Sequence, residues 1–94
     1  MINSFIFDYS KTAEKFFAKH EDIRKEFKKC IARIINNDNP ELINFKNLKD
    51  KLKGYSRIAI SGYRVIFTII NGEIIIVRVI SAGSRGDIYK HSML

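Results

Sequence analysis

The chain has 94 residues, of which 46% are hydrophobic and 29% charged, and its formal net charge is +7. A chain of this length builds one hydrophobic core, so we expect a single domain over residues 1–94. The composition excludes a largely disordered protein. No stretch approaches the ~18 apolar residues of a membrane span, and the N-terminus lacks a signal-peptide pattern. We therefore expect a cytoplasmic protein without a membrane partner.

The positive charge is concentrated in the second half of the chain. Residues 1–44 carry eight Lys or Arg and seven Asp or Glu, whereas residues 45–94 carry nine and three. A one-sided basic field points to a polyanion such as nucleic acid, or to an acidic protein partner. The alternative is that the net charge only aids solubility.

The first half predicts a strand followed by helices. Residues 2–7 alternate loosely between apolar and polar side chains, which is typical of a short strand. Over residues 11–37 apolar side chains recur at steps of three and four, after Ser10 as a plausible N-cap. We favour two helices joined near His20 over one long helix. Their phenylalanine-rich face is interpreted as core.

The connection after the helices is rich in lysine. Pro40 and the Asn/Asp cluster before it end the helical region. Residues 41–55 predict either a short amphipathic turn or an extended connector. Their lysines are interpreted either as a solvated face or as an electrostatic rim that holds a phosphate backbone: Lys46, Lys49, Lys51 and Lys53.

Three strands are predicted at residues 57–60, 63–70 and 73–81. Asn71 and Gly72 predict a two-residue type I′ turn, so these strands should be consecutive and antiparallel. Residues 74–77 are all apolar, which suggests a central strand and leaves the helix-facing side open. The expected fold class is α+β, with an antiparallel sheet of about four strands backed by a pair of N-terminal helices, in the order β-α-α-β-β-β.

Several kinds of chemistry lack the residues they need. Cys30 is the only cysteine, which excludes an internal disulfide and a cysteine-based zinc site, and its apolar flanks predict a small buried hydrophobe. His20 and His91 lie far apart and neither has a companion at ligand spacing, so no metal or other cofactor is expected. The basic half contains only three acidic residues, which leaves little for a two-carboxylate mechanism: Asp50, Glu73 and Asp87.

Arginine, lysine and tyrosine remain, and this set can cleave RNA without a metal. The RNA supplies its own nucleophile, the 2′-hydroxyl. Arginine neutralises the charge that develops on the phosphorane through its bidentate fork. Tyrosine or lysine transfers protons where nearby cations lower its pKa.

The segments SRIAISGYRVIF and IIIVRVISAGSRGDIYK resemble the RelE-like toxins of bacterial toxin–antitoxin systems. The shared pattern is a basic residue opening one strand, a Tyr-Arg pair opening the next, a long apolar strand, and a closing Arg followed by Tyr. The resemblance implies a ribosome-dependent endoribonuclease that cuts mRNA in the A site and contacts 16S rRNA. It also implies silencing by an acidic RelB-like antitoxin, within a toxin–antitoxin hetero-oligomer.

The resemblance assigns roles to four residues. Arg64 matches the arginine of the Tyr-Arg pair and Arg85 matches the closing arginine, and both would stabilise the transition-state phosphate. Tyr89 matches the C-terminal tyrosine, which is implicated in proton transfer from the 2′-hydroxyl and in stacking on a base. Arg57 matches the basic residue that opens the second predicted strand and would support the same charge.

The pattern departs at Ala59, where many members carry a second Lys or Arg. Lys53 or Lys90 is a candidate to supply the missing charge. His91 is an alternative proton carrier, because some relatives use a histidine near this end.

Structural and functional alternatives stay open at this point. Arg64 could pair with Asp87, Tyr63 could be a packed strand residue, and Arg78 could be an edge or structural arginine. A ParE-like toxin would share the fold but inhibit DNA gyrase by binding, without RNase activity. An inactive relative would act only with its antitoxin, as a repressor component.

Overall fold

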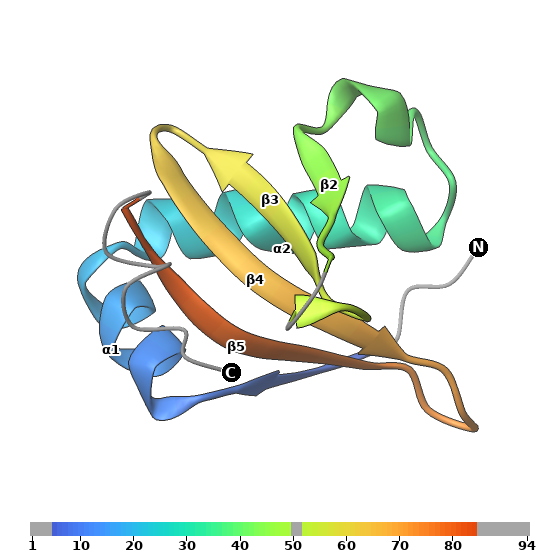
Figure 1. Cartoon of the computed structure of the whole chain (residues 1–94), viewed down its shortest axis with the longest axis horizontal. Coiled ribbons are helices and arrows are strands. Elements are labelled where there is room, and N and C mark those ends of the chain that lie inside the picture. The colour runs from blue at the N-terminus through green and yellow to red at the C-terminus, as the bar shows by residue number, and fades with distance from the viewer. Residues whose placement is uncertain (1–4, 50–51, 85–94) are drawn as a thin grey trace.

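Five strands and two helices make up residues 5–49 and 52–84, the part of the chain that the computed structural model describes (Figure 1). The α+β class predicted from the sequence is confirmed. The elements follow one another as β1 (Ile6–Tyr9), α1 (Lys11–Lys19), α2 (Glu21–Ile35), the 3-10 turn η1 (Pro40–Leu42), β2 (Phe45–Asn47), β3 (Ser56–Ile60), β4 (Tyr63–Ile70) and β5 (Ile76–Ser84).

The strands form one mixed sheet in the order β1-β5-β4-β3-β2. As predicted, β3, β4 and β5 are consecutive and antiparallel, and β5 lies inside the sheet. The prediction of a purely antiparallel sheet of about four strands is incomplete in two ways. β1 pairs with β5 in parallel, because the two helices return the chain to the same end of the sheet. The connector supplies a fifth strand, β2, antiparallel to β3.

A break at His20 divides the helical region into α1 and α2, which confirms the prediction of two helices. Ser10 caps α1: its hydroxyl accepts a hydrogen bond from the Ala13 amide at 3.1 Å and donates one to the Ile80 carbonyl at 2.8 Å. The cap therefore fixes the start of α1 against β5. His20 stacks on the Phe16 ring at 4.3 Å, which stabilises the corner between the helices.

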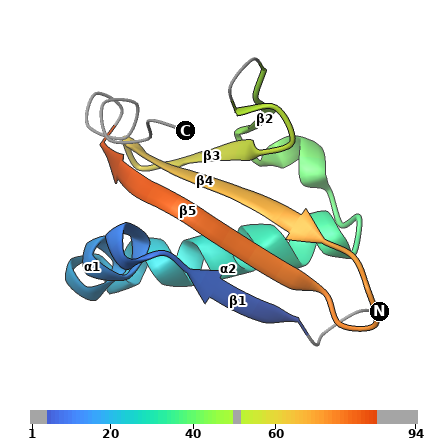
Figure 2. The ribbon, with the colours of Figure 1, turned by 60° about the horizontal axis from the view of Figure 1, so that its bottom comes forward.

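The two helices pack on the same face of the sheet (Figures 1 and 2). Strand alternation turns the even-numbered residues of β3 and the odd-numbered residues of β4 toward them. The fully buried side chains of this layer are Phe17, Phe27, Ile31, Ile58, Val65, Val77 and Val79, with Phe67 1% exposed. In the described residues no helix is long and apolar enough to cross a membrane.

The tight hairpin turn lies at Ser61 and Gly62, and the turn predicted at Asn71 and Gly72 is wrong. Ile60 pairs with Tyr63, and the two residues between them have φ of 48° and 83°, as a type I′ turn requires. In the second hairpin Ile70 pairs with Ile76, so five residues separate the strands. β5 accordingly begins and ends three residues later than the predicted strand at 73–81.

Two further boundaries differ from the sequence predictions. The first strand was expected at residues 2–7, but β1 continues to Tyr9, because Asp8 and Tyr9 still pair with Arg78 and Val79 of β5. Residues 1–4 lie outside the described part of the chain. In the connector, Pro40 opens η1 and the chain then runs extended through β2, so the extended alternative holds for residues 45–47.

Candidate functional site

The sheet face that the helices leave free carries the arginines predicted to be functional. Opposite to the core-facing positions, β3 presents Arg57 and Ala59, and β4 presents Arg64, Ile66 and Thr68. We call this surface the open face. Both predicted arginines that the structure describes therefore lie on one side of two neighbouring strands.

Strand register brings Arg57 and Arg64 close together. Arg57 pairs with Ile66, and Arg64 pairs with Ala59, so the two arginines are diagonal neighbours, with Cα atoms about 7 Å apart. Ile66 lies beside both and is fully buried. The register therefore places the two arginines on the same face of adjacent strands.

Both guanidinium groups contain an unsatisfied donor. The Nε atoms of Arg57 and Arg64 are buried and have no hydrogen-bond partner among the described residues. The Nη1 atom of Arg64 donates to the carbonyl of Tyr63 at 3.2 Å. A buried donor without an acceptor costs about 1–3 kcal/mol, so an acceptor supplied to this pair would be stabilising.

No carboxylate of the described residues neutralises this arginine pair. The ion pairs found there are Arg24–Glu21, Lys29–Glu26 and Arg78–Asp8. Only the last lies on the open face, where the Nε of Arg78 donates to Asp8 at 3.0 Å across β5 and β1. Arg78 is thus the structural arginine of the sequence alternatives. Asp87, the other suggested partner of Arg64, lies outside the described residues.

The connector adds cations to the rim of the open face. Lys46 pairs with Arg57 across β2 and β3, so its position is on the same face, and its side chain is exposed. Lys49 and Lys53 are also exposed. Thr68 on β4 donates its hydroxyl to the carbonyl of Gly54 at 2.9 Å, which ties the connector to the sheet. Lys51 falls outside the described residues.

Four predicted site residues cannot be placed, because Arg85, Tyr89, Lys90 and His91 lie outside the described part of the chain. β5 ends at Ser84, whose register partner is Tyr63. Their predicted roles stay predictions. Tyr63 itself is the packed strand residue of the sequence alternatives, since its ring lies 5.2 Å from Phe16.

Ala59 is the position at which the sequence departs from the RelE-like pattern. It pairs directly with Arg64. A basic side chain here would have stood beside Arg64 on the open face, and alanine leaves that place uncharged. Lys53, suggested as its substitute, lies in the connector that Thr68 ties to the sheet.

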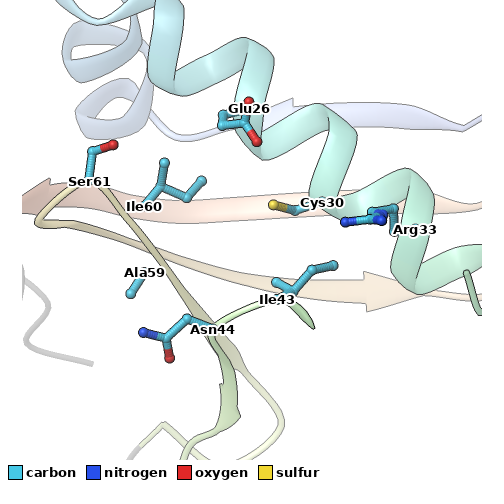
Figure 3. A pocket seen from close by; sticks show the side chains of 8 residues that line it. All are labelled: Glu26, Cys30, Arg33, Ile43, Asn44, Ala59, Ile60 and Ser61. Atoms are coloured by element: carbon cyan, nitrogen blue, oxygen red, sulfur yellow. The ribbon is translucent and has the colours of Figure 1, made fainter. Parts of the chain in front are cut away.

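A groove of about 490 Å³, which no sequence pattern predicted, runs between α2 and the edge of β3 (Figure 3). Its walls include Glu26, Cys30 and Arg33 from α2, with Ala59 and Ser61 from the strand and turn. Cys30 is half-buried rather than fully buried as predicted. Burial, and then Glu26, raise the pKa of its thiol, while Arg33 lowers it. The thiol is therefore mostly protonated at neutral pH and a poor nucleophile.

The described residues contain no group of three or more His, Cys, Asp or Glu placed to hold a metal ion. Tyr55, which the sequence reasoning passed over, lies two residues before Arg57. On a strand this spacing places both residues on the same face, and it was the signal that could have drawn attention to Tyr55.

Sheet order, paired helices and a cationic open face define the class of protein: a small toxin of the RelE/ParE superfamily. The family model for the ParE toxin of the type II toxin–antitoxin system parDE matches residues 7–85. The chain belongs to this family. No curated protein matches the chain in sequence.

Two solved structures share the fold. RelE in the RelB–RelE antitoxin–toxin complex from Methanococcus jannaschii is similar over 90% of this chain and 98% of that one, with 30% identity and a TM-score of 0.57. YafQ from Escherichia coli strain BL21(DE3) is similar over 88% of this chain and 96% of that one, with 18% identity and a TM-score of 0.60. The chain is therefore a toxin of a type II toxin–antitoxin system, as the RelE-like motifs predicted.

Proposed function

We propose that this toxin is a metal-independent endoribonuclease that cleaves mRNA in the ribosomal A site and so inhibits translation. The observation that carries the proposal is the pair Arg57 and Arg64, whose buried Nε donors have no acceptor on the open face. A phosphate between them would satisfy both donors. The likeness to the RelE toxin of the RelB–RelE complex agrees with the RelE-like motif, from which the proposed activity also follows.

The reaction needs three contributions from the protein: removal of the proton from the 2′-hydroxyl, stabilisation of the charge on the phosphorane, and a proton for the leaving 5′-oxygen. The 2′-oxygen attacks the adjacent phosphorus, and the bond from phosphorus to the 5′-oxygen breaks. Arg57 and Arg64 would hold the non-bridging oxygens as negative charge develops on them. The resemblance adds Arg85 to this role and gives Tyr89 the proton transfer, with Lys90 or His91 as alternative proton carriers.

The substrate-binding surface follows from the charge. Lys46, Lys49 and Lys53 would hold the RNA backbone and 16S rRNA at the rim of the open face, and the sequence prediction gives Lys51 the same role. An acidic antitoxin of the RelB type would neutralise the same basic surface in a hetero-oligomer, which the RelB–RelE complex supports.

Gyrase inhibition is the second candidate function, and two observations favour it. The family model that matches is that of ParE toxins, and Ala59 leaves the position opposite Arg64 without a second cation. A toxin of this kind would bind DNA gyrase and cleave no RNA.

The test is expression of the toxin and two variants in bacteria, with primer extension across a translated mRNA. The wild type and Arg78→Ala are expected to arrest growth and to produce cuts within codons that require translation. Arg64→Ala is expected to produce neither, although both variants remove one arginine from the open face. Since one oxyanion-binding donor is worth about 10²–10³ in rate, the difference should be unmistakable.

Other outcomes would overturn the proposal. Double-strand DNA breaks without mRNA cuts would favour gyrase inhibition. A wild-type chain that never arrests growth would favour the inactive, repressor-only relative. Cleavage by Arg64→Ala at the wild-type rate would exclude the arginine pair as the site.

A further inference from the structure

Tyr55 extends the open face by one position beyond Arg57. The amide of Leu48 donates to the carbonyl of Tyr55 at 3.0 Å, so the pairing of β2 with β3 continues one residue past Asn47 and Ser56. Alternation then places Tyr55 on the same side as Arg57, about 6.6 Å along the strand. Lys46, opposite Arg57, is its diagonal neighbour.

The surroundings of Tyr55 differ from those of the other described tyrosines. Tyr9 and Tyr63 lie on the helix side of the sheet, where their rings contact Phe17 at 5.5 Å and Phe16 at 5.2 Å. No ring contact of Tyr55 is found within the described residues, and its side chain is only half-buried. The core therefore does not account for an aromatic residue at this position.

The backbone that carries Tyr55 is fixed at several points. Its amide donates to the carbonyl of Leu52 at 3.0 Å, and the preceding Gly54 turns the chain with φ of 95°. The Thr68 hydroxyl holds the Gly54 carbonyl at 2.9 Å. The ring is thus carried by a turn anchored to both β2 and β4, and little conformational entropy remains to be lost when a ligand binds.

We propose that Tyr55 is a nucleobase-binding platform, on which a base of single-stranded RNA stacks while the neighbouring phosphate lies on Arg57 and Arg64. This inference rests on the proposed function, because it takes RNA as the ligand. Basic side chains that hold the backbone beside an aromatic ring that holds a base are the usual means of binding single-stranded nucleic acid. Every base has a π-face, so this subsite grips RNA without reading its sequence.

The test measures binding separately from cleavage. An RNA oligonucleotide with 2′-O-methyl sugars throughout has no free 2′-hydroxyl and cannot be cut, and a 2-aminopurine in it loses fluorescence on stacking. The variants are Tyr55→Ala, Tyr55→Phe, which keeps the ring, and Tyr55→Leu, which keeps apolar bulk without a flat π-face. Thermal unfolding of each variant shows that it is folded.

We expect Tyr55→Ala and Tyr55→Leu to bind the oligonucleotide about 5- to 150-fold more weakly and to lose the quenching. Tyr55→Phe should stay within about twofold of the wild type. An oligonucleotide with an abasic position in place of the 2-aminopurine should bind the wild type and Tyr55→Ala equally. A folded Tyr55→Ala that binds the intact oligonucleotide as tightly as the wild type would overturn the inference.

Failure of this inference and failure of the proposed function give different results. If the wild type cleaves mRNA and Tyr55→Ala binds and cleaves as it does, the platform is refuted and the endoribonuclease stands. If the wild type cleaves nothing but shows quenching that depends on Tyr55, the endoribonuclease is refuted and the platform stands. A wild-type chain that neither cleaves nor binds RNA refutes both.

Discussion

Replacing Arg64 by methionine is expected to stabilise the domain while removing its activity. Arg64 lies diagonally across from Arg57, and both Nε atoms are buried without an acceptor. Methionine keeps an unbranched apolar stem against Ile66 but removes the positive charge and the unsatisfied donor. Arg64 should therefore lower the stability of the domain, and we expect it to be retained for its function.

The size of the effect follows from three contributions. If the two charges are taken to be as far apart as the Cα atoms, about 7 Å, they repel by ~0.6 kcal/mol at a dielectric constant of 80 and ~2.4 kcal/mol at 20. We use about 1 kcal/mol for these half-buried side chains. Removing an unsatisfied buried donor adds about 1 kcal/mol. Losing the hydrogen bond from Arg64 to the Tyr63 carbonyl subtracts about 1 kcal/mol. The free energy of unfolding should therefore rise by about 1 kcal/mol.

The assay is urea denaturation at 0.1 M and 1 M NaCl, with Arg78→Met as the control. Arg78→Met removes the same charge from the same face, but it breaks the exposed ion pair with Asp8, so it should lower stability by ~0–1 kcal/mol. The gain from Arg64→Met should shrink at 1 M NaCl, where the Debye length falls to ~3 Å. If Arg64→Met lowers stability as much as Arg78→Met does, Arg64 is a structural residue and the reasoning is refuted.

Two further predictions concern the fold. Gly62→Ala should lower the free energy of unfolding by about 1 kcal/mol in urea denaturation, because φ at this position is 83°; an unchanged value would argue against the type I′ turn. Burial raises the pKa of Tyr9 above its usual 10.0, and its buried hydroxyl has no hydrogen-bond partner among the described residues. The stability that the protonated phenol contributes is therefore complete below pH ~10 and is lost as the pH rises through the pKa of the folded state. Urea denaturation of the wild type and of Tyr9→Phe at pH 8 and pH 11 measures this effect. Between these pH values the free energy of unfolding should fall less for Tyr9→Phe than for the wild type, and equal falls would contradict the reasoning.

The helices and the antiparallel strands could be predicted because their signals are local. Apolar spacing identified both helices, and Ser10 acts as the predicted cap. The pairing of β1 with β5 could not be predicted, since it joins residues about 70 positions apart. β2 has only three residues, all exposed, so no apolar alternation marked it.

The misplaced hairpin turn has a physical cause that the sequence does contain. A two-residue turn at Asn71 and Gly72 would pair Val65 with Arg78 and turn that arginine toward the helices. An unpaired charge would then be buried in the core, at a cost that no turn preference offsets. The five-residue loop instead places Arg78 on the open face, where it pairs with Asp8. Register, rather than the local turn signal, decides this hairpin.

Both arginines of the candidate site follow from the RelE-like motif, whereas their proximity follows from the strand register. The Tyr-Arg pair singled out Arg64, and the basic residue that opens the preceding strand singled out Arg57. The absence of an acceptor for their Nε atoms could not be foreseen, because it depends on which acidic residues lie near them in space. Tyr55 was missed since it precedes the predicted strand, although it continues the same alternation.

A bulge in β5 gives the open face its shape beside Arg64. The register between β4 and β5 shifts between Ile66 and Phe67, so that Ser81 pairs with Ile66 and Gly83 with Arg64. Without this shift Ser81 would pair with Val65 in the core, and Ala82 would stand beside Arg64. The bulge instead sends Ala82 into the core, where it is 6% exposed, and places a residue without a side chain next to Arg64. Bulges often redirect side chains next to functional sites, and this one leaves the β5 side of Arg64 without a neighbouring side chain at its register partner.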